Sequence, residues 1–366
     1  MKELLEDIGR WRAAGKQVAL ARVVGTDGSG PRDPGAAMAV NEDSEVIGSV
    51  SGGCVEGAVL TEGLKVLERG IPKLVTYGIA DDDAFAVGLT CGGTIHIFID
   101  DFNDEIDVAI SEALQTGEPA ALATVIEGPG AGSKLLVRPD QDPIGSLGHP
   151  DLDRVVARDA LGELEAGRTG TRNYGVHGEA RREEGVKVFI ESFALPPKMI
   201  IFGAIDFTAA LARLGRLLGY HVTVCDARPV FATRKRFPMA NEVINEWPDR
   251  YLEVVGKELG PRDAVCVLTH DPKFDVPAIM AAVETKAGYL GVMGSRRTHE
   301  KRLERLKEAG LDDEGFARMM SPIGLDLGAR TPEETAVSIC AEIIASRTGR
   351  QAPFSLRDTE GPLHKR

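Results

Sequence analysis

A repeat inside the first half of the chain is the strongest constraint on its fold. Three segments recur 97 residues further along: Ile47–Ser49 as Ile144–Ser146, Leu64–Gly70 as Leu161–Gly167, and Tyr77–Gly78 as Tyr174–Gly175. Chance matches would not keep one register over this length. Val18–Val24 also resembles Ala120–Ile126, and Ile95–Asp100 resembles Val186–Glu191. We predict that residues 18–100 and 120–191 are two copies of one α/β fold, each with two or three strands, a helix and a closing strand.

The two copies differ at the positions where chemistry is expected. The first copy has a cysteine beside paired glycines in Ser51-Gly-Gly-Cys54 and again in Thr90-Cys-Gly-Gly93, and the second copy has neither thiol. Glycines let backbone N–H groups approach a ligand closely, and such donors favour the thiolate that binds soft metals. A zinc site is disfavoured, because no histidine accompanies the two thiols at metal spacing. Alternatively, both cysteines are small buried hydrophobic residues.

From Lys198 onward, short apolar strands alternate with helices. We predict strands at 199–202, 221–226, 252–255, 264–269 and 289–293. Apolar strands joined by helices indicate a Rossmann-like, doubly wound parallel sheet. We therefore expect an N-terminal domain over residues 1–195, a Rossmann-like domain over 196–347, and a polar tail over 348–366.

The first turn of this second half has only part of a dinucleotide-binding fingerprint. Gly203-Ala204 follows the first strand, and Asp226 ends the second strand, where an acidic residue meets a ribose in such folds. However, Ile205 replaces the second glycine and obstructs the approach of a pyrophosphate, and Asp206 adds negative charge nearby. The sequence therefore favours the fold more strongly than it favours NAD binding.

Further polar residues follow the later strands of the predicted sheet. His270-Asp271 follows the fourth strand, and Gly294-Ser-Arg-Arg297 follows the fifth and opens a helix. A helix N-terminus with two guanidinium groups suits a phosphate, although a solvated helix face is the alternative. Thr331-Pro-Glu-Glu334 has the residues of an N-terminal capping box and predicts a helix to about Ala345.

Composition excludes several classes of partner. The 366 residues include 43 Lys and Arg against 56 Asp and Glu, a net charge of −13, which disfavours nucleic acids and anionic membranes. Five scattered cysteines without a CxxC pair are typical of free thiols in a reducing cytosol. The N-terminus lacks the apolar core of a signal peptide, and no apolar run reaches the roughly 20 residues that a membrane-spanning helix needs. We expect a cytoplasmic protein.

In this order, the motifs resemble the XdhC/CoxI family of molybdenum-hydroxylase accessory proteins. The segments that carry the resemblance are Gly28–Arg32, Gly48–Glu56, Leu89–Gly93, Phe202–Ala204, Asp226–Pro229, His270–Asp271, Gly294–Arg297 and Pro322–Glu334. They cover nearly the whole chain apart from the tail. The sequence departs from the family at Ile205 and Asp206, where the pattern commonly has Gly-His.

The resemblance implies a maturation factor that binds the molybdenum cofactor (molybdopterin), supports its sulfuration, and inserts it into a xanthine dehydrogenase-type hydroxylase. It also implies that a cysteine desulfurase is a partner. It favours an accessory protein over an independent enzyme. We expect Cys54 and Cys91 as the catalytic residues, facing one cavity. The expected cofactor-binding residues are Ser29, Gly30, Arg32, Gly52, Gly53, Cys54, Glu56, Cys91, Gly92, Gly93, Gly203, Ala204, Asp226, Arg228, His270, Ser295, Arg296 and Arg297.

Two other functions compete with this interpretation. One is an NAD(P)-dependent oxidoreductase that uses the C-terminal Rossmann-like domain. The other is a scaffold that only docks on the hydroxylase and does not need its cysteines. The sequence leaves open whether the cofactor carries an added nucleotide, which hydroxylase is served, and whether the chain forms a homodimer.

Overall fold

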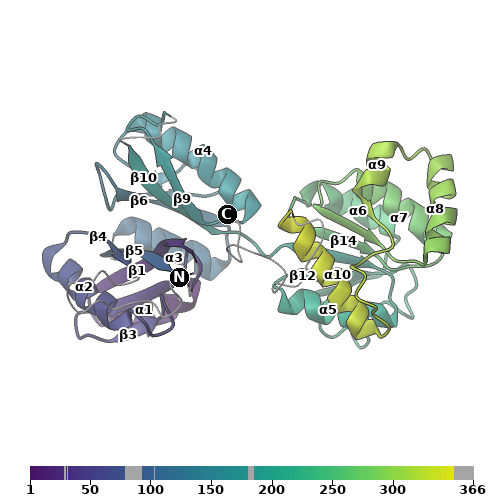
Figure 1. Ribbon diagram of the computed structural model, residues 1–366, viewed down its shortest axis with the longest axis horizontal. Coiled ribbons are helices and arrows are strands. Elements are labelled where there is room, and N and C mark those ends of the chain that lie inside the picture. Colours follow the sequence, from purple (N-terminus) through teal and green to yellow (C-terminus); the bar gives the residue numbers. More distant parts are fainter. Residues whose placement is uncertain (29, 31, 79–92, 103, 180–184, 350–366) are drawn as a thin grey trace. The chain divides into compact units, whose positions relative to one another are not determined.

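The computed structural model describes residues 1–28, 30, 32–78, 93–102, 104–179 and 185–349. The described chain forms two compact units, one over residues 1–195 and the other over residues 196–349 (Figure 1). Among the helices described, we find none with the length and apolar character needed to span a bilayer.

The N-terminal unit contains two five-stranded sheets with the same topology. In the first sheet the order is β3-β2-β1-β5-β4, and in the second it is β8-β7-β6-β10-β9. All neighbouring strands are antiparallel. The strands are β1 (Val18–Asp27), β2 (Ala37–Asn41), β3 (Val46–Gly48), β4 (Lys73–Tyr77) and β5 (Thr94–Asp101), then β6 (Ala120–Glu127), β7 (Lys134–Val137), β8 (Ile144–Gly145), β9 (Gly170–Tyr174) and β10 (Val186–Phe193). The duplicated α/β fold predicted from the sequence is confirmed.

Each copy also contains two helices at equivalent points of the chain. The short 3-10 helix η1 (Lys2–Leu4) and α1 (Leu5–Ala13) precede the first sheet, and α3 (Glu105–Thr116) precedes the second. Along the chain, α2 (Glu56–Arg69) follows the third strand of the first copy, and α4 (Pro150–Ala166) follows the third strand of the second. Both end on a left-handed glycine, Gly70 at φ 65° and Gly167 at φ 62°, which is a common helix stop. Each copy is therefore larger than predicted, with a leading helix and two strands after its second helix.

The two copies pack against each other through equivalent strands. Val24 on β1 and Phe98 on β5 form one apolar cluster with Ile126 on β6 and Phe189 on β10. Val24 and Ile126 occupy matching positions of the repeat, as do Phe98 and Phe189. The contact between copies is thus related by the internal symmetry.

A buried polar cluster lies in the same interface. Arg22 Nη2 is 2.9 Å from Asp100 Oδ2, and Arg22 Nη1 donates to Thr124 Oγ1 of the second copy at 3.3 Å and lies 3.8 Å from Glu191 Oε2. Lys134 adds a second cation 3.3 Å from Asp100. All five residues are buried. Burial opposes the charge on Arg22, but the nearby carboxylates outweigh it and raise the arginine's pKa.

The second unit is a six-stranded parallel sheet in the order β13-β12-β11-β14-β15-β16. Its strands are β11 (Lys198–Phe202), β12 (His221–Cys225), β13 (Glu242–Ile244), β14 (Ala264–Val267), β15 (Tyr289–Val292) and β16 (Met319–Met320). Its helices are α5 (Asp206–Leu217), α6 (Pro248–Val255), 3-10 helix η2 (Gly256–Glu258), α7 (Pro272–Val283), α8 (Arg296–Glu308), α9 (Asp313–Arg318) and α10 (Pro332–Arg347). Separate apolar cores lie on the two faces, one under α5 and α10 and one under α6 and α7. The predicted Rossmann-like sheet is confirmed.

One predicted strand of this sheet is wrong. Residues 252–255 form the end of α6, and the strand beside β12 is Glu242–Ile244. Leu252 is buried while Val254 is 76% exposed, as on an amphipathic helix. Pro248 at the first helical position indicates a helix here, whereas the apolar residues at 252–255 suggested a strand.

We predict that Arg22→Met destabilises the N-terminal unit by about 3–5 kcal/mol, because the change leaves Glu191 buried without its arginine and Asp100 with Lys134 alone. The measurement is denaturant unfolding followed by Trp11 fluorescence in a Trp247→Phe background, since these are the two tryptophans of the chain. Arg154→Met, on an exposed part of α4, is the control and should change stability by no more than about 0.5 kcal/mol. Equal effects of the two changes would contradict the prediction.

Candidate functional site

The loop that carries Cys54 is folded around the carboxylate of Glu56. This loop joins β3 to α2, and both carboxylate oxygens accept several hydrogen bonds from it. Glu56 Oε1 accepts from Ser49 Oγ at 2.6 Å, Val50 N at 3.2 Å and Ser51 N at 2.9 Å, and Oε2 accepts from Ser51 Oγ at 2.5 Å, Gly53 N at 2.9 Å and Val55 N at 3.2 Å. We call this arrangement the Glu56 cage.

The cage fixes the charge of its carboxylate. Burial would raise the pKa of Glu56, but the hydrogen bonds from Ser49, Ser51 and the backbone outweigh it and lower the pKa to about 2. Since this lies below the ordinary value of 4.5, the carboxylate stabilises the folded loop at pH values above about 4.5. That stabilisation is lost as the pH falls through about 2.

The second copy repeats the cage without the thiol. Asp153, 97 residues after Glu56, accepts from Ser146 Oγ at 2.7 Å and from Leu147 N at 2.6 Å. The residue equivalent to Cys54 is Asp151. The loop geometry is therefore a property of the repeated scaffold, and the thiol is particular to the first copy.

The glycines before Cys54 are required by the backbone. Gly52 and Gly53 have φ angles of 76° and 116°, which other residues rarely adopt. Among the described residues, no atom beyond their chain neighbours lies within 4 Å of where their side chains would begin. Cys54 itself is half-buried against the core under α2.

A second feature of this unit is a pocket of about 760 Å³ between the two copies. This volume lies within the range of about 300–1,000 Å³ that holds a cofactor-sized ligand. The lining residues that can interact with a ligand are Asp27, Gly28, Gly30, Arg32, Asp33 and His96 from the first copy and Thr169, Thr171, Asn173 and Lys187 from the second. We call it the inter-copy pocket.

A histidine of this pocket is held in place on both sides. His96 Nε2 lies 2.9 Å from Asp27 Oδ2, and His96 Nδ1 lies 2.9 Å from Thr76 Oγ1. Thr171 Oγ1 donates to the carbonyl oxygen of Val24 at 2.8 Å and so ties the second copy to β1 at the pocket wall. The sequence alone indicates only an ordinary half-exposed strand residue at His96. The polar residues of the second copy carry no signal in the sequence, because only packing brings them here.

The structure brings part of the predicted site together. Gly30 and Arg32 line the inter-copy pocket, and a side chain on Gly28 would begin 3.7 Å from the Cα atom of Gly93. Gly52, Gly53, Cys54 and Glu56 are not among the described lining residues of this pocket. Ser29, Cys91 and Gly92 lie outside the described residues, so a cavity shared by both thiols stays a prediction.

In the C-terminal unit, Asp226 is occupied by its own chain. Its Oδ2 accepts from Ala204 N at 2.7 Å and from Arg228 Nη2 at 2.7 Å, while Oδ1 accepts from Arg228 N and Nε, both at 2.9 Å. Burial would raise the pKa of Asp226, but these hydrogen bonds lower it. Gly203 has φ 108°, and a side chain there would begin only 3.0 Å from Thr269. The acid that would bind a ribose therefore fastens the first turn, which argues against a nicotinamide site here.

The remaining predicted residues lie after β14 and β15. His270 is exposed, and Ser295 caps α8 by accepting from Thr298 N at 3.2 Å. Arg297 is exposed, and nothing is described for the side chain of Arg296. Beneath them lies a buried arginine that no sequence motif indicates, Arg302, whose Nη2 is 2.9 Å from Asp275 and 2.8 Å from the carbonyl oxygen of Met293.

No group of three or more His, Cys, Asp or Glu side chains in the described part of the chain is placed to hold a metal ion directly.

Comparison with known proteins gives matches along most of the chain. A model described as the XdhC and CoxI family matches residues 11–78 and 113–175, and one described as the XdhC Rossmann domain matches residues 199–343. A Bacillus subtilis protein named as a probable subunit of xanthine dehydrogenase is 28% identical over 91% of this chain and 94% of its own. The molybdenum cofactor insertion chaperone PaoD of Escherichia coli is 27% identical over 91% of this chain and 85% of its own.

A solved structure shares the fold of the whole chain. It is a crystal structure of a Bacillus halodurans protein described as a xanthine dehydrogenase, with a TM-score of 0.68 and 24% identity. The match covers 97% of this chain and 98% of the other.

We predict that Glu56→Gln speeds amide hydrogen exchange in residues 50–55 by about ten-fold or more, because the loop loses charged hydrogen bonds. Mass spectrometry of the corresponding peptide measures this. Asp153→Asn is the matched control and should affect only the loop of the second copy. If Glu56→Gln leaves the exchange unchanged, the carboxylate does not hold the loop.

A second prediction concerns the first turn of the Rossmann-like unit. Titration with NAD should give no binding at micromolar concentrations, because Asp226 is paired and Ile205 stands where the pyrophosphate would approach. The measurement is quenching of protein fluorescence or calorimetry. Micromolar binding that Asp226→Asn abolishes would contradict the prediction.

Proposed function

Because the chain belongs to the XdhC and CoxI family, we propose that it binds the molybdenum cofactor and supports its insertion into a xanthine dehydrogenase-type hydroxylase. The observation that carries this proposal is the likeness to a molybdenum cofactor insertion chaperone over 91% of this chain. The chain acts as a maturation factor and not as the hydroxylase itself.

The residues of the N-terminal unit fit such a ligand. The inter-copy pocket of about 760 Å³ is large enough for a pterin with its phosphate. Its glycine-rich edge at Gly28 and Gly30 allows close approach of the backbone. Arg32 supplies positive charge for a phosphate, and so does Lys187, whose ammonium also pairs with Glu127 at 2.6 Å. His96 and Asn173 offer hydrogen-bonding groups to a polar heterocycle.

The thiols suit the metal end of the same ligand. Molybdenum bound by a dithiolene is a soft centre that thiolates can ligate. We propose that Cys54, on the rigid Glu56 cage, and Cys91 hold this end. A cysteine desulfurase partner would be the source of the sulfur that the cofactor carries when the hydroxylase receives it.

The competing functions make different demands. An NAD-dependent oxidoreductase needs the carboxylate that Asp226 shares with Arg228 and Ala204, which disfavours this alternative. A docking scaffold needs neither the thiols nor a ligand pocket. Substitution of the cysteines should therefore leave a scaffold's function intact, whereas it should impair a maturation factor that binds the cofactor.

We predict that Cys54→Ser and Cys91→Ser each lower cofactor retention by about ten-fold or more, since a hard, protonated oxygen replaces a soft sulfur. The protein is co-expressed with the cofactor pathway, purified and denatured, and the released ligand is identified and quantified by mass spectrometry. Hydroxylase activation is measured in a reconstituted mixture. Cys340→Ser, a buried thiol of the second unit, is the control and should retain the cofactor.

The outcomes separate the parts of the proposal. If the wild-type protein carries no molybdenum cofactor, the binding function is wrong. If the double variant retains the cofactor and activates the hydroxylase normally, both cysteines serve core packing and the scaffold alternative is supported.

A further inference from the structure

Arg302 lies almost completely buried beneath the turn that joins β15 to α8. The residue is 2% exposed, and its Nη2 donates to Asp275 Oδ2 at 2.9 Å and to the carbonyl oxygen of Met293 at 2.8 Å. Its Nη1 is also buried, and this atom has no hydrogen-bond partner among the described residues. A buried donor without an acceptor costs about 1–3 kcal/mol, so an acceptor from a ligand would stabilise this nitrogen.

His299, one turn nearer the start of α8, has a second buried nitrogen of this kind. Its Nδ1 has no hydrogen-bond partner in the part of the chain that the structure describes. Burial and the charge of Arg302 lower the pKa of His299, so its imidazole is neutral at pH 7. A neutral imidazole can carry its proton on Nδ1 and donate it to an oxygen. His299 and Arg302 are three residues apart, so both nitrogens belong to one face of the helix.

The first turn of α8 supplies further donors beside these two side chains. Ser295 caps the helix, because its Oγ accepts from Thr298 N at 3.2 Å and its carbonyl oxygen accepts from His299 N at 2.9 Å. The N–H group of Arg297, at the second helical position, has no acceptor within the helix and points out of its end. The exposed guanidinium of Arg297 and the positive end of the helix dipole favour an anion here.

Gly294 keeps the space next to the guanidinium clear. A side chain on Gly294 would begin 3.3 Å from Arg302 Nη1, 3.4 Å from Arg302 Nη2 and 3.4 Å from Thr298 Cβ. These distances are shorter than ordinary van der Waals contacts, so even a methyl group would crowd the guanidinium. Gly294 is only half-buried, and we expect a small group to reach Arg302 past it.

The donors of this turn suit an oxyanion. Asp275 already balances the charge of Arg302, and its other carboxylate oxygen accepts from the hydroxyl of Thr269. What a ligand meets is therefore a set of N–H groups at the positive end of a helix, with Arg297 beside them. Phosphoryl and carboxylate oxygens are the acceptors that such helix ends bind. The turn also lies at the carboxyl ends of parallel strands, where open α/β sheets bind their ligands.

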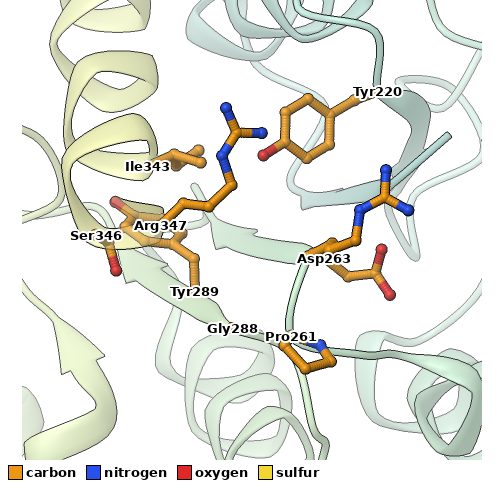
Figure 2. Close-up of a pocket in the computed structure, with 9 residues that line it drawn as sticks. Tyr220, Pro261, Asp263, Gly288, Tyr289, Ile343, Ser346 and Arg347 are labelled. Carbon is orange, nitrogen blue, oxygen red and sulfur yellow. The ribbon is translucent and has the colours of Figure 1, made fainter. Parts of the chain in front are cut away.

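The opposite edge of the sheet offers no comparable donors. A pocket of about 190 Å³ lies there, at the amino ends of the strands (Figure 2). Both carboxylate oxygens of Asp263 accept backbone N–H groups, at 2.6 and 2.7 Å, and the hydroxyl of Tyr289 donates to Glu342 at 2.5 Å. Arg262 also interacts within the chain. These groups stabilise the fold, whereas Arg302 Nη1 has no such partner among the described residues.

We propose that Arg302 and the first turn of α8 form a binding site for an oxyanion, the phosphoryl or carboxylate group of a small ligand. Arg302 Nη1 is the buried anchor, and the N–H group of Arg297 and the imidazole of His299 complete the site. The sequence motif indicates only Arg296 and Arg297, whereas the anchor lies further along the same helix. The site does not rest on molybdenum cofactor binding and gives the second unit a ligand of its own.

The test is binding of inorganic phosphate and of acetate to the full-length protein, by calorimetry at fixed ionic strength with chloride as the reference salt. We expect saturable binding of at least one anion, weakened about ten-fold or more by Arg302→Lys, which keeps a cation beside Asp275 but removes the forked donors. Gly294→Ala should weaken binding by a similar factor, because its methyl group crowds the guanidinium. Arg305→Met, on the exposed face of the same helix, is the control and should bind like the wild type.

Thermal unfolding of each variant shows whether it is folded, and either Arg302→Lys or Gly294→Ala decides the test if the other is not. Amide hydrogen exchange in residues 293–300 should slow when the wild-type protein is saturated. Tighter binding of phosphate identifies a phosphoryl ligand, tighter binding of acetate identifies a carboxylate, and equal binding shows that the site recognises the oxygens that both share. The proposal is overturned by no saturable binding of either anion, by wild-type affinity in the folded variants, or by slower exchange only elsewhere. None of these results bears on molybdenum cofactor retention.

Discussion

The buried contact of Arg22 with Asp100 and Glu191 governs the N-terminal unit, because it joins the two copies through charged groups that are almost fully buried. Each copy contributes the same two positions of the repeat. Asp100 corresponds to Glu191, and Arg22 corresponds to Thr124. Two carboxyl groups thus share one guanidinium, and the acid of the second copy, Glu191, is paired with the arginine of the first. Burial raises the pKa of Glu191, and the charge of Arg22 opposes this shift.

This contact also places the inter-copy pocket. Arg22 and Thr124 lie on β1 and β6, and the same two strands continue into the pocket at Val24 and Ile126. The pocket walls are therefore fixed by the interface that the ion pairs close. The Glu56 cage is independent of this interface, because its partners lie within eight residues of sequence. A ligand that contacted both the inter-copy pocket and the Glu56 cage would meet one site formed by long-range packing and another formed by local hydrogen bonds.

The duplication was visible in the sequence because its middle segments keep one spacing, from Ile47 to Tyr77. The outer strands do not: β1 and β6 match at 102 residues and β5 and β10 at 91, since loop lengths differ. The capping box at Thr331 and Glu334 was likewise predictable, because it is a local signal, and the structure contains it. By contrast, Lys187 and Thr171 reach the pocket beside Gly28 only through tertiary packing, which no local pattern encodes.

In the C-terminal unit, the acid at the end of the second strand is engaged by its own chain. Asp226 stands where a ribose would be bound, yet its carboxylate accepts hydrogen bonds from Arg228 and Ala204. A dinucleotide would have to break this bidentate ion pair and leave Arg228 without its acid, at a cost of several hydrogen bonds to a charged group. The acid now holds β12 to the first turn of the sheet. An acidic residue at this position therefore predicts the fold correctly, but it does not by itself predict a bound dinucleotide.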